Sequence, residues 1–194
     1  MIRRLIAVGL ALLLAAPPLD PLFDVVMGRH LLGQVPALLL LGAVAGWPPA
    51  RGPVTARPLA GLAFAIGAIA FWMIPRSLDA AVRSNAADQL LHLSMFTAGL
   101  ALARVLPRLP VPVSLGLGVH AVAMVGALGL VYRYYPGLIC TTYNLTQQRA
   151  AGLTMVRAAP LLWLGLWAWA VSRAGRNQGR PRHDPSTAAP AFRT

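Results

Sequence analysis

The chain has 194 residues, of which 57% are hydrophobic and only 11% are charged, and its mean hydropathy is +0.64. Soluble domains carry about 25% charged residues, so this composition argues against a water-soluble enzyme and for a protein built for lipid. The net charge is +12, from 17 basic residues that are all arginine and 5 acidic residues that are all aspartate. The arginines are scattered between apolar blocks instead of forming one basic patch, so no nucleic-acid partner is expected.

Six apolar blocks follow one another along the chain, and each has about the length that a transmembrane helix needs. They cover residues 3–18, 25–46, 58–75, 87–106, 112–133 and 150–172. Arg3 and Arg4 precede the first block as in a signal peptide, but prolines directly follow Ala15 and Ala16, which makes a poor cleavage site. We therefore expect this block to be retained. The sequence predicts an all-α fold, a polytopic transmembrane helical bundle of about six spans.

The positions of the charges predict the orientation of this bundle. If six spans alternate, the arginines of the N-terminus, of residues 51–57, of residues 104–108 and of the C-terminal tail all fall on one side. By the positive-inside rule that side is the cytoplasm, and Asp20, Asp24 and Asp79 fall on the other side. The pattern predicts a multi-pass protein of the bacterial inner (plasma) membrane with both termini in the cytoplasm. Residues 1–173 would form the bundle, and residues 174–194 a disordered, basic cytoplasmic tail.

Two local patterns predict how the helices lie and pack. The segment 76–88 is polar with apolar residues at helical spacing, which indicates a short amphipathic helix along the membrane interface. Small residues within the spans allow backbones to approach where lipid supplies no hydrophobic drive. The glycines expected to act in this way are Gly61, Gly67, Gly116, Gly118, Gly126 and Gly129.

A few polar residues interrupt the apolar spans, and such residues are costly in lipid and tend to be functional. They include three of the four histidines, His30, His92 and His120, each of which the topology places in the outer half of a different span. Met95 lies three residues after His92 and Met124 four after His120, so each pair shares a helix face. Imidazole and thioether groups together suit copper, particularly Cu(I). Asp88, four residues before His92, is placed to orient that imidazole through its second ring nitrogen.

Other interpretations of these residues remain open at this point. A histidine in a membrane helix can simply hydrogen-bond to another helix, and a methionine there can be packing material. Asp79 and Asp88 suit loop or cap roles better than an acid pair. Cys140, the single cysteine, is either a transient copper ligand or an inert thiol.

Several separated motifs, in the same order over residues 18–157, resemble those of the CtaG-type cytochrome c oxidase assembly proteins. The first comprises Asp20-Pro21-Leu22, Met27 to Leu32 and Pro36 to Gly42. The next is Phe71 to Pro75 through Asp79, followed by Leu91-His92-Leu93-Ser94. The last are His120 with Met124, Tyr134-Tyr135, and the run Gln147 to Met155. The chain departs from the family pattern at Val26, Gln147 and Arg149, and it has six expected spans where the family has seven.

This resemblance implies a membrane protein that helps to mature a haem-copper oxidase by delivering copper to an oxidase subunit, and it implies no enzymatic activity. The ligands that it carries over are His30, His92 and His120, with Met95 or Met124 as soft ligands. Two other functions stay open. One is a metal-free accessory subunit of a respiratory or photosynthetic membrane complex, which the missing family residues favour. The other is a b-type haem protein that uses two of the histidines as axial ligands for electron transfer.

Overall fold

The computed structural model describes residues 2–17, 19–47 and 56–178 of the chain, and this part is helical with no strand. Its first half contains α1 (Ile2–Leu14), α2 (Asp20–Asp24), α3 (Met27–Arg29), the π-helical turn η1 (His30–Gln34) and α4 (Val35–Gly46). Its second half contains α5 (Ala56–Trp72), α6 (Pro75–Arg83), α7 (Asn85–Val105), the 3₁₀ turn η2 (Leu106–Arg108), α8 (Val111–Tyr134) and α9 (Leu145–Gln178). The expected all-α class is confirmed.

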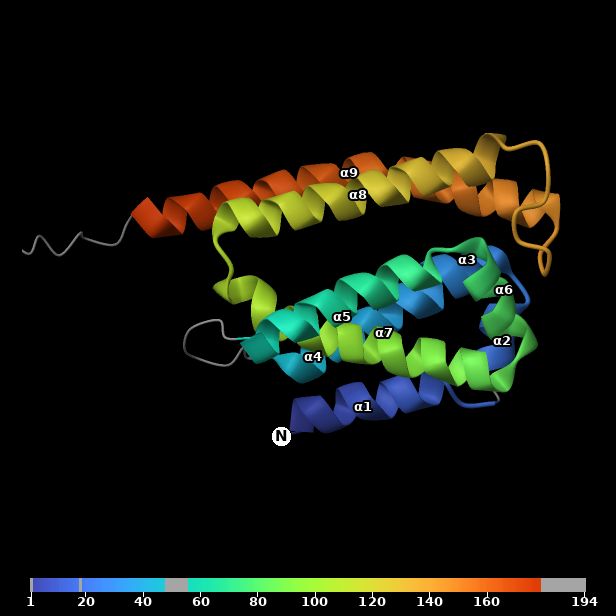
Figure 1. Ribbon diagram of the computed structural model, residues 1–194, viewed down its shortest axis with the longest axis horizontal. Coiled ribbons are helices and arrows are strands. Elements are labelled where there is room, and N and C mark those ends of the chain that lie inside the picture. The colour runs from blue at the N-terminus through green and yellow to red at the C-terminus, as the bar shows by residue number, and fades with distance from the viewer. Residues whose placement is uncertain (1, 18, 48–55, 179–194) are drawn as a thin grey trace, which may run out of the picture.

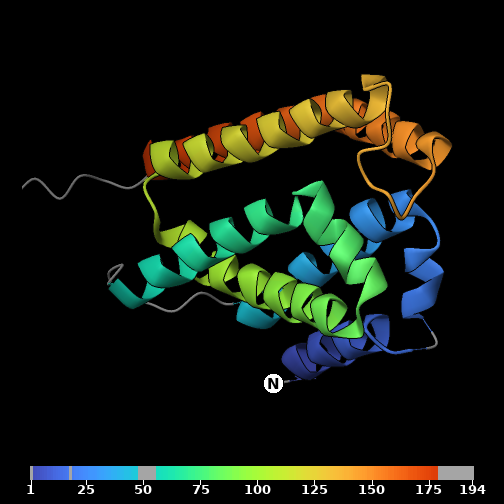
Figure 2. The same ribbon diagram turned by 45° about the vertical axis from the view of Figure 1, so that its right-hand side comes forward.

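The long helices run side by side between two ends of the molecule (Figure 1). Helix α7 packs against α4, α5 and α6, and α1 packs on α4. Helices α8 and α9 pack mainly on each other and form a hairpin along one side, which a second view also shows (Figure 2). We call the end that holds α2, α3, α6 and the start of α7 the aspartate end, because it carries Asp20, Asp24, Asp79 and Asp88.

Four helical segments are long and apolar enough to cross a membrane: Met27–Gly46, Asn85–Arg108, Val111–Tyr134 and Leu145–Gly175. The bent pair Pro58–Trp72 and Pro75–Arg83 brings the number to five if it counts as one span. The expected number of about six is thus not reached. The difference lies in α1, whose 13 residues give a helix of about 20 Å, short of the roughly 30 Å of a hydrocarbon core.

Helix α6 bears out the amphipathic segment expected at 76–88, although it ends at Arg83 and a new helix starts at Asn85. Its axis turns by 81° from that of α5, so it lies along the membrane surface if α5 crosses the membrane. Leu78 and Ala81 bury its apolar face. Asp79 accepts hydrogen bonds from the backbone N–H groups of Thr141 and Thr142 and thereby fastens the loop after α8.

The closest approach between helices joins α4 and α7 through a reciprocal pair of glycines. A Cβ atom on Gly42 would lie 1.9 Å from the Phe96 carbonyl oxygen, and one on Gly99 would lie 1.9 Å from that of Leu39. The α8–α9 pair uses Gly129 in the same way, against Met155. By contrast, the expectation for Gly67 and Gly116 was wrong, because nothing lies within 4 Å of a Cβ atom at either position. Both glycines lie on exposed faces of their helices.

The last helix continues past residue 173 to Gln178, so the expected boundary between bundle and tail falls within α9. The remainder of the expected tail, residues 179–194, lies outside the described residues, as does Arg51. Near the end of α9, Arg173 donates to the carbonyl oxygens of Pro107 and Leu109. This contact connects the α8–α9 hairpin to the turn that follows α7.

Candidate functional site

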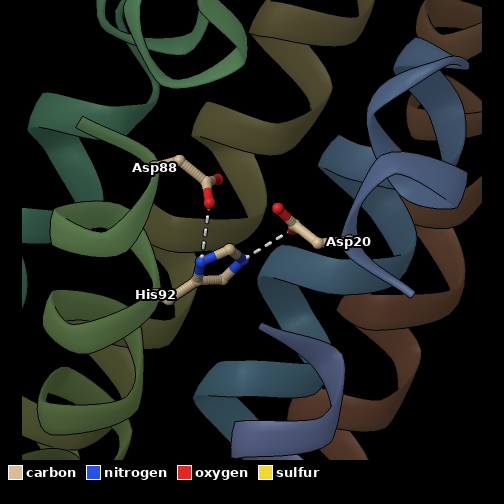
Figure 3. A group of neighbouring side chains, drawn as sticks. All are labelled: Asp20, Asp88 and His92. Atoms are coloured by element: carbon tan, nitrogen blue, oxygen red, sulfur yellow. Dashed lines mark ion pairs between the residues drawn. The ribbon is translucent and has the colours of Figure 1, made fainter. Parts of the chain in front are cut away.

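Three side chains from two helices converge at the aspartate end around the ring of His92 (Figure 3). His92 Nε2 lies 3.3 Å from Asp20 Oδ1, and His92 Nδ1 lies 3.1 Å from Asp88 Oδ2. One ligand atom from each of Asp20, Asp88 and His92 lies within 4.8 Å of the others. Asp88 and His92 are buried in α7 and Asp20 is half-buried at the start of α2. We call these three residues the Asp–Asp–His cluster.

The helical period explains why two members of this cluster, Asp88 and His92, lie together. Asp88 precedes His92 by four residues, so both side chains lie on one face of α7, as the sequence predicted for the orienting carboxylate. Asp20 comes from a different part of the chain. The short connection after α1 brings α2 across the aspartate end, with Pro21 in its first turn. That crossing places the Asp20 carboxylate at Nε2, the ring nitrogen that Asp88 does not face (Figure 3).

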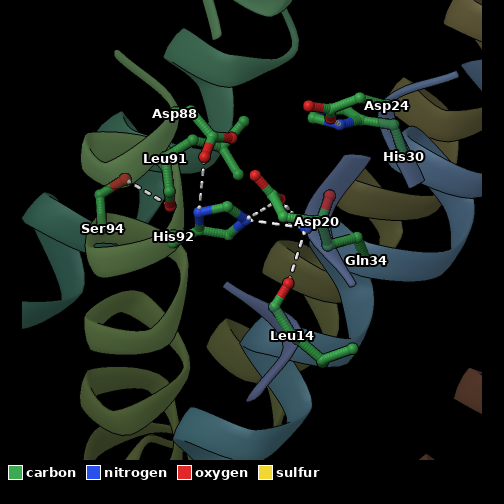
Figure 4. A network of polar contacts seen from close by, with 9 residues as sticks. All are labelled: Leu14, Asp20, Asp24, His30, Gln34, Asp88, Leu91, His92 and Ser94. Carbon is green, nitrogen blue, oxygen red and sulfur yellow. Dashed lines mark hydrogen bonds and ion pairs between the residues drawn. The ribbon is translucent and has the colours of Figure 1, made fainter. Parts of the chain in front are cut away.

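Gln34 joins the cluster from the π-helical turn. This side chain is fully buried, and its amide Nε2 donates to Asp20 Oδ1 at 2.6 Å and to the Leu14 carbonyl oxygen at 3.2 Å. The same nitrogen lies 2.8 Å from His92 Nε2. Figure 4 shows the amide between Asp20, Leu14 and the His92 ring. Gln34 is therefore the fourth polar group of the site, and π-turns occur frequently at functional sites.

A second carboxylate–imidazole pair lies on the other side of Gln34. His30 Nδ1 lies 2.7 Å from Asp24 Oδ1, and the His30 ring is fully buried (Figure 4). Its Nε2 has no hydrogen-bond partner among the described residues. His30 does not belong to the group that lies within 4.8 Å, so the structure keeps it apart from the Asp–Asp–His cluster.

The other predicted ligands do not reach the cluster. His120 and Met124 lie on an exposed face of α8. Helix α8 packs on α9 through a different face, the one that carries Gly129. Met95 is buried, but in the hydrophobic core with Leu91, Leu38 and Met27. The expected meeting of His30, His92 and His120 was therefore wrong. Helical spacing placed each residue on a face of its own helix but did not determine which face a neighbour covers.

The charge balance of the aspartate end is unusual for a chain with a net charge of +12. In the described part of the chain, every ion pair joins an aspartate to a histidine, and none joins an aspartate to an arginine. Burial raises the pKa of the Asp20 carboxyl, the hydrogen bond from Gln34 opposes this, and the negative charges of Asp88 and Asp24 raise it further. Among the described residues, imidazole rings are thus the only ion-pair partners of Asp20, Asp24 and Asp88.

Several buried atoms of the site have no hydrogen-bond partner in the part of the chain that the structure describes. They are Asp88 Oδ1, Gln34 Oε1 and His30 Nε2, together with His92 Nδ1, which lies close to Asp88 without good hydrogen-bond geometry. Buried polar atoms of this kind cost about 1–3 kcal/mol each, so they are rare unless they have a role. Carboxylate oxygen and imidazole nitrogen are ligands for divalent transition metals. The residues present therefore fit a metal ion, with a donor set harder than the imidazole–thioether set expected for Cu(I).

An apolar cavity of about 410 Å³ adjoins His92. It lies between α1, α4 and α7 and is lined by apolar side chains such as Ala11, Leu38 and Phe96. Gln89 and His92 are the polar residues of its wall. A hydrated ion would gain nothing on this side of the ring, because the polar contacts of His92 Nε2 are with Asp20 and Gln34.

Sequence reasoning missed Asp20 as a site residue because it was assigned to an external loop. Gln34 is a polar residue within the apolar block 25–46, but no spacing rule connects it to His92, 58 residues later in the chain. Cys140 is fully buried, and its thiol points to the Tyr132 hydroxyl at 3.8 Å, away from the cluster. Burial raises the pKa of this thiol to about 11, which fits the inert alternative.

The fold and the site together define an all-helical protein with membrane-spanning candidates and a buried carboxylate–imidazole cluster at one end of the bundle. No family model, curated protein or solved structure matches this chain.

Proposed function

We propose that this chain is a membrane-embedded assembly factor for a haem-copper oxidase, which binds copper at the Asp–Asp–His cluster and hands it to an oxidase subunit. The observation that carries the metal part of the proposal is the convergence of Asp20, Asp88 and His92 within 4.8 Å, in buried surroundings and without an arginine partner. The oxidase part rests on the motifs that resemble the CtaG-type family. Copper is the cargo in this proposal.

The proposal includes a location and an orientation. The chain lies in the bacterial inner membrane with the aspartate end at the periplasmic face and both termini in the cytoplasm. Six helical segments then alternate in direction, and α1 is a short first segment that packs against α4. Support comes from the charges, although the division is not complete. Asp20, Asp24, Asp79 and Asp88 lie at the aspartate end together with a few arginines, such as Arg29 and Arg83, whereas the helix ends that meet at the other end carry arginines and no aspartate among the described residues: Arg3, Arg104, Arg108 and Arg173.

The site residues would divide the work in a simple way. His92 supplies the nitrogen ligand, and the carboxylates supply oxygen ligands and the negative charge that attracts a cation. Because ligand groups must be deprotonated to bind a metal, protonation of the cluster would release the cargo. Burial of α7 and η1 keeps the imidazole in a fixed orientation and excludes competing water.

Metal analysis of the purified protein tests this function. We expect protein produced in copper-supplemented cells to contain about one copper per chain, and His92→Ala to contain almost none. His120→Ala is the matched control, because it removes the same group from an exposed position on α8 and should leave the copper content unchanged. A wild-type protein that takes up no copper, or a His92→Ala protein that retains it, would contradict the metal role.

A deletion strain tests the oxidase role separately. We expect loss of oxidase activity in membranes that lack this chain, with recovery by the wild type and by His120→Ala but not by His92→Ala. Full oxidase activity without the chain would contradict the assembly role even if copper binds.

One observation favours a second function, that of a metal-free accessory subunit of a membrane complex. His30 Nδ1 lies 2.7 Å from Asp24 Oδ1 and His92 Nδ1 lies 3.1 Å from Asp88 Oδ2, so the fold can use these two contacts as structural pairs. Isolation of the native complex distinguishes the two functions. An accessory subunit stays at one copy per mature complex, whereas an assembly factor is absent after assembly is finished.

A further inference from the structure

The Gln34 amide is the polar group of the site whose hydrogen bonds are least balanced. Its NH₂ group has two hydrogens, but three atoms that can accept lie within 3.2 Å of Nε2: Asp20 Oδ1, the Leu14 carbonyl oxygen and, in the tautomer that carries its proton on Nδ1, His92 Nε2. Its oxygen Oε1 is buried and has no partner among the described residues. One end of the amide therefore has too many acceptors, and the other end has no donor.

The positions around Nε2 match those of ligands around one metal ion. Ligand atoms about 2.1 Å from an ion lie about 3.0–3.4 Å apart at bond angles near 90–109°. His92 Nε2 and Asp20 Oδ1 are 3.3 Å apart, and the Gln34 amide nitrogen lies 2.8 Å and 2.6 Å from them. Shifts of a few tenths of an ångström would bring all three positions to coordinating distances. The Leu14 carbonyl points to the same place (Figure 4).

The two sides of the His92 ring have different surroundings. Nδ1 faces Asp88, which comes from the same helix, whereas Nε2 faces Asp20 and Gln34, which come from other elements. A carboxylate on one ring nitrogen and a metal on the other is the usual arrangement of metal-binding histidines. The ion of the proposed function would then bind at Nε2, and Asp88 would hold the ring.

We propose that Gln34 is a metal ligand that changes its orientation with the state of the site. Without an ion, the amide nitrogen donates a hydrogen bond to Asp20 Oδ1, the oxygen that would otherwise coordinate the cation. With an ion, a half-turn of the amide exchanges Nε2 and Oε1, so that the oxygen coordinates the ion beside Asp20 Oδ1 and His92 Nε2. Two oxygens and one imidazole nitrogen favour a divalent ion such as Cu²⁺ or Zn²⁺ over Cu⁺. Asp88 is a positioning residue in this arrangement.

This inference rests on the proposed function and names its cargo as the oxidised, divalent ion. Gln34→Glu and Gln34→Leu test it, with purified full-length protein in detergent and Cu²⁺ or Zn²⁺ as the probe. A carboxylate at position 34 keeps an oxygen ligand and adds charge, so Gln34→Glu should tighten Cu²⁺ binding about 10-fold. Gln34→Leu keeps the volume but removes the ligand, so it should weaken binding at least 10-fold. If Gln34 acted only as a donor to Asp20, Gln34→Leu would free that carboxylate for the ion and would leave Cu²⁺ binding unchanged or tighter instead of weaker.

Two further measurements keep the test decisive. Gln148→Leu is the matched control, because Gln148 is also fully buried but has both ends of its amide hydrogen-bonded, to Ile139 and Gly137. It should bind Cu²⁺ as the wild type does. The electron paramagnetic resonance spectrum of the wild-type Cu²⁺ complex should show coupling to one imidazole nitrogen, and Asp88→Asn should weaken binding about 10- to 100-fold while leaving that coupling in place.

The outcomes separate the two proposals. Wild-type protein that binds Cu²⁺ with an affinity that neither Gln34 variant changes would overturn the role of Gln34 and leave the metal function standing. Coupling to two or more imidazole nitrogens would also overturn it. A wild type that binds neither Cu²⁺ nor Zn²⁺ but binds Cu⁺ would overturn the divalent assignment alone, and one that binds none of the three would overturn both proposals.

Discussion

The contact between α4 and α7 makes a sharp prediction for Gly99→Ala. A Cβ atom at this position would lie 1.9 Å from the Leu39 carbonyl oxygen, whereas Cβ atoms in folded proteins essentially never come closer than 3.0 Å. The helices must therefore separate by at least about 1.1 Å, the difference between these two values. The atom in the way belongs to the backbone, so no side-chain rotation relieves the clash. Forced backbone shifts of this kind cost about 1–3 kcal/mol.

The same shift reaches the candidate site, because α7 carries His92 and the turn before α4 carries Gln34. Gly99 lies seven residues after His92, about 10 Å along the helix. A separation of about 1.1 Å would lengthen the 2.8 Å distance between Gln34 Nε2 and His92 Nε2 to about 3.9 Å, beyond hydrogen-bond range. We therefore expect Gly99→Ala to lower both the melting temperature in detergent and the Cu²⁺ affinity.

Gly67→Ala is the control, because nothing lies within 4 Å of a Cβ atom at that exposed position on α5. Alanine is the better helix former by about 0.5–1 kcal/mol, so this variant should unfold at or above the wild-type temperature. Gly42→Ala, on the other side of the same contact, should resemble Gly99→Ala, and the double variant should cost less than the sum because one separation relieves both clashes. A Gly99→Ala protein with wild-type stability and affinity would refute this reasoning.

Three further predictions concern other buried groups. The pKa of Asp79 is lowered: burial alone would raise it, but hydrogen bonds from Thr141 and Thr142 outweigh burial. Because its pKa is lowered in the folded protein, ionised Asp79 stabilises the fold above the unfolded value near 3.8, and this stabilisation is lost as the pH falls through the folded value. Asp79→Asn should therefore cost about 1–3 kcal/mol in thermal unfolding at pH 7 and progressively less below pH 4. An equal cost at every pH would contradict this. Cys140 is buried, and burial raises the pKa of its thiol to about 11, so about one thiol in a thousand is ionised at pH 8. Maleimide labelling of Cys140 should therefore require unfolding. Rapid labelling of the folded protein would be inconsistent with this burial. Ser94 Oγ accepts a hydrogen bond from the buried Trp72 indole N–H at 2.8 Å, so Ser94→Ala should lower the free energy of unfolding by about 1–3 kcal/mol. Ser172→Ala removes an exposed hydroxyl from α9 and should have little effect. Equal melting temperatures for the two variants would contradict the role of the Ser94–Trp72 bond.

Hydropathy and helical spacing predicted the elements of this fold well, because both depend on residues close together in the chain. The apolar blocks, the interfacial helix α6 and the position of Asp88 four residues before His92 all follow from such local patterns. The length of α1 was overestimated because its helix stops at Leu14, before the prolines at 17 and 18. Local patterns do not show which helix faces meet. The glycines at 42 and 99 contact a backbone while those at 67 and 116 have nothing within 4 Å of a Cβ atom, although all four lie within similar apolar stretches of the sequence.

The candidate site was only half predicted for the same reason. His92 and Asp88 share one helix, so their spacing indicates a pair, whereas Asp20 and His92 are brought together by the whole arrangement of α1, α2 and α7. His120 shows the opposite error. It follows the same helical rules as His92, but α8 packs on α9 and leaves that face of the helix exposed.

The π-helical turn explains why even a careful helical projection of residues 25–46 fails. In this turn the Val35 N–H bonds to the His30 carbonyl oxygen, five residues back, instead of four as in an α-helix. More residues then fit into one turn, so a projection with a constant 100° step misplaces everything before the turn relative to everything after it. His30 and Asp24 lie before the turn, and the Gly42 contact with α7 lies after it. The turn thus changes the direction of His30 and of the residues before it relative to the face of α4 on which Gly42 contacts α7.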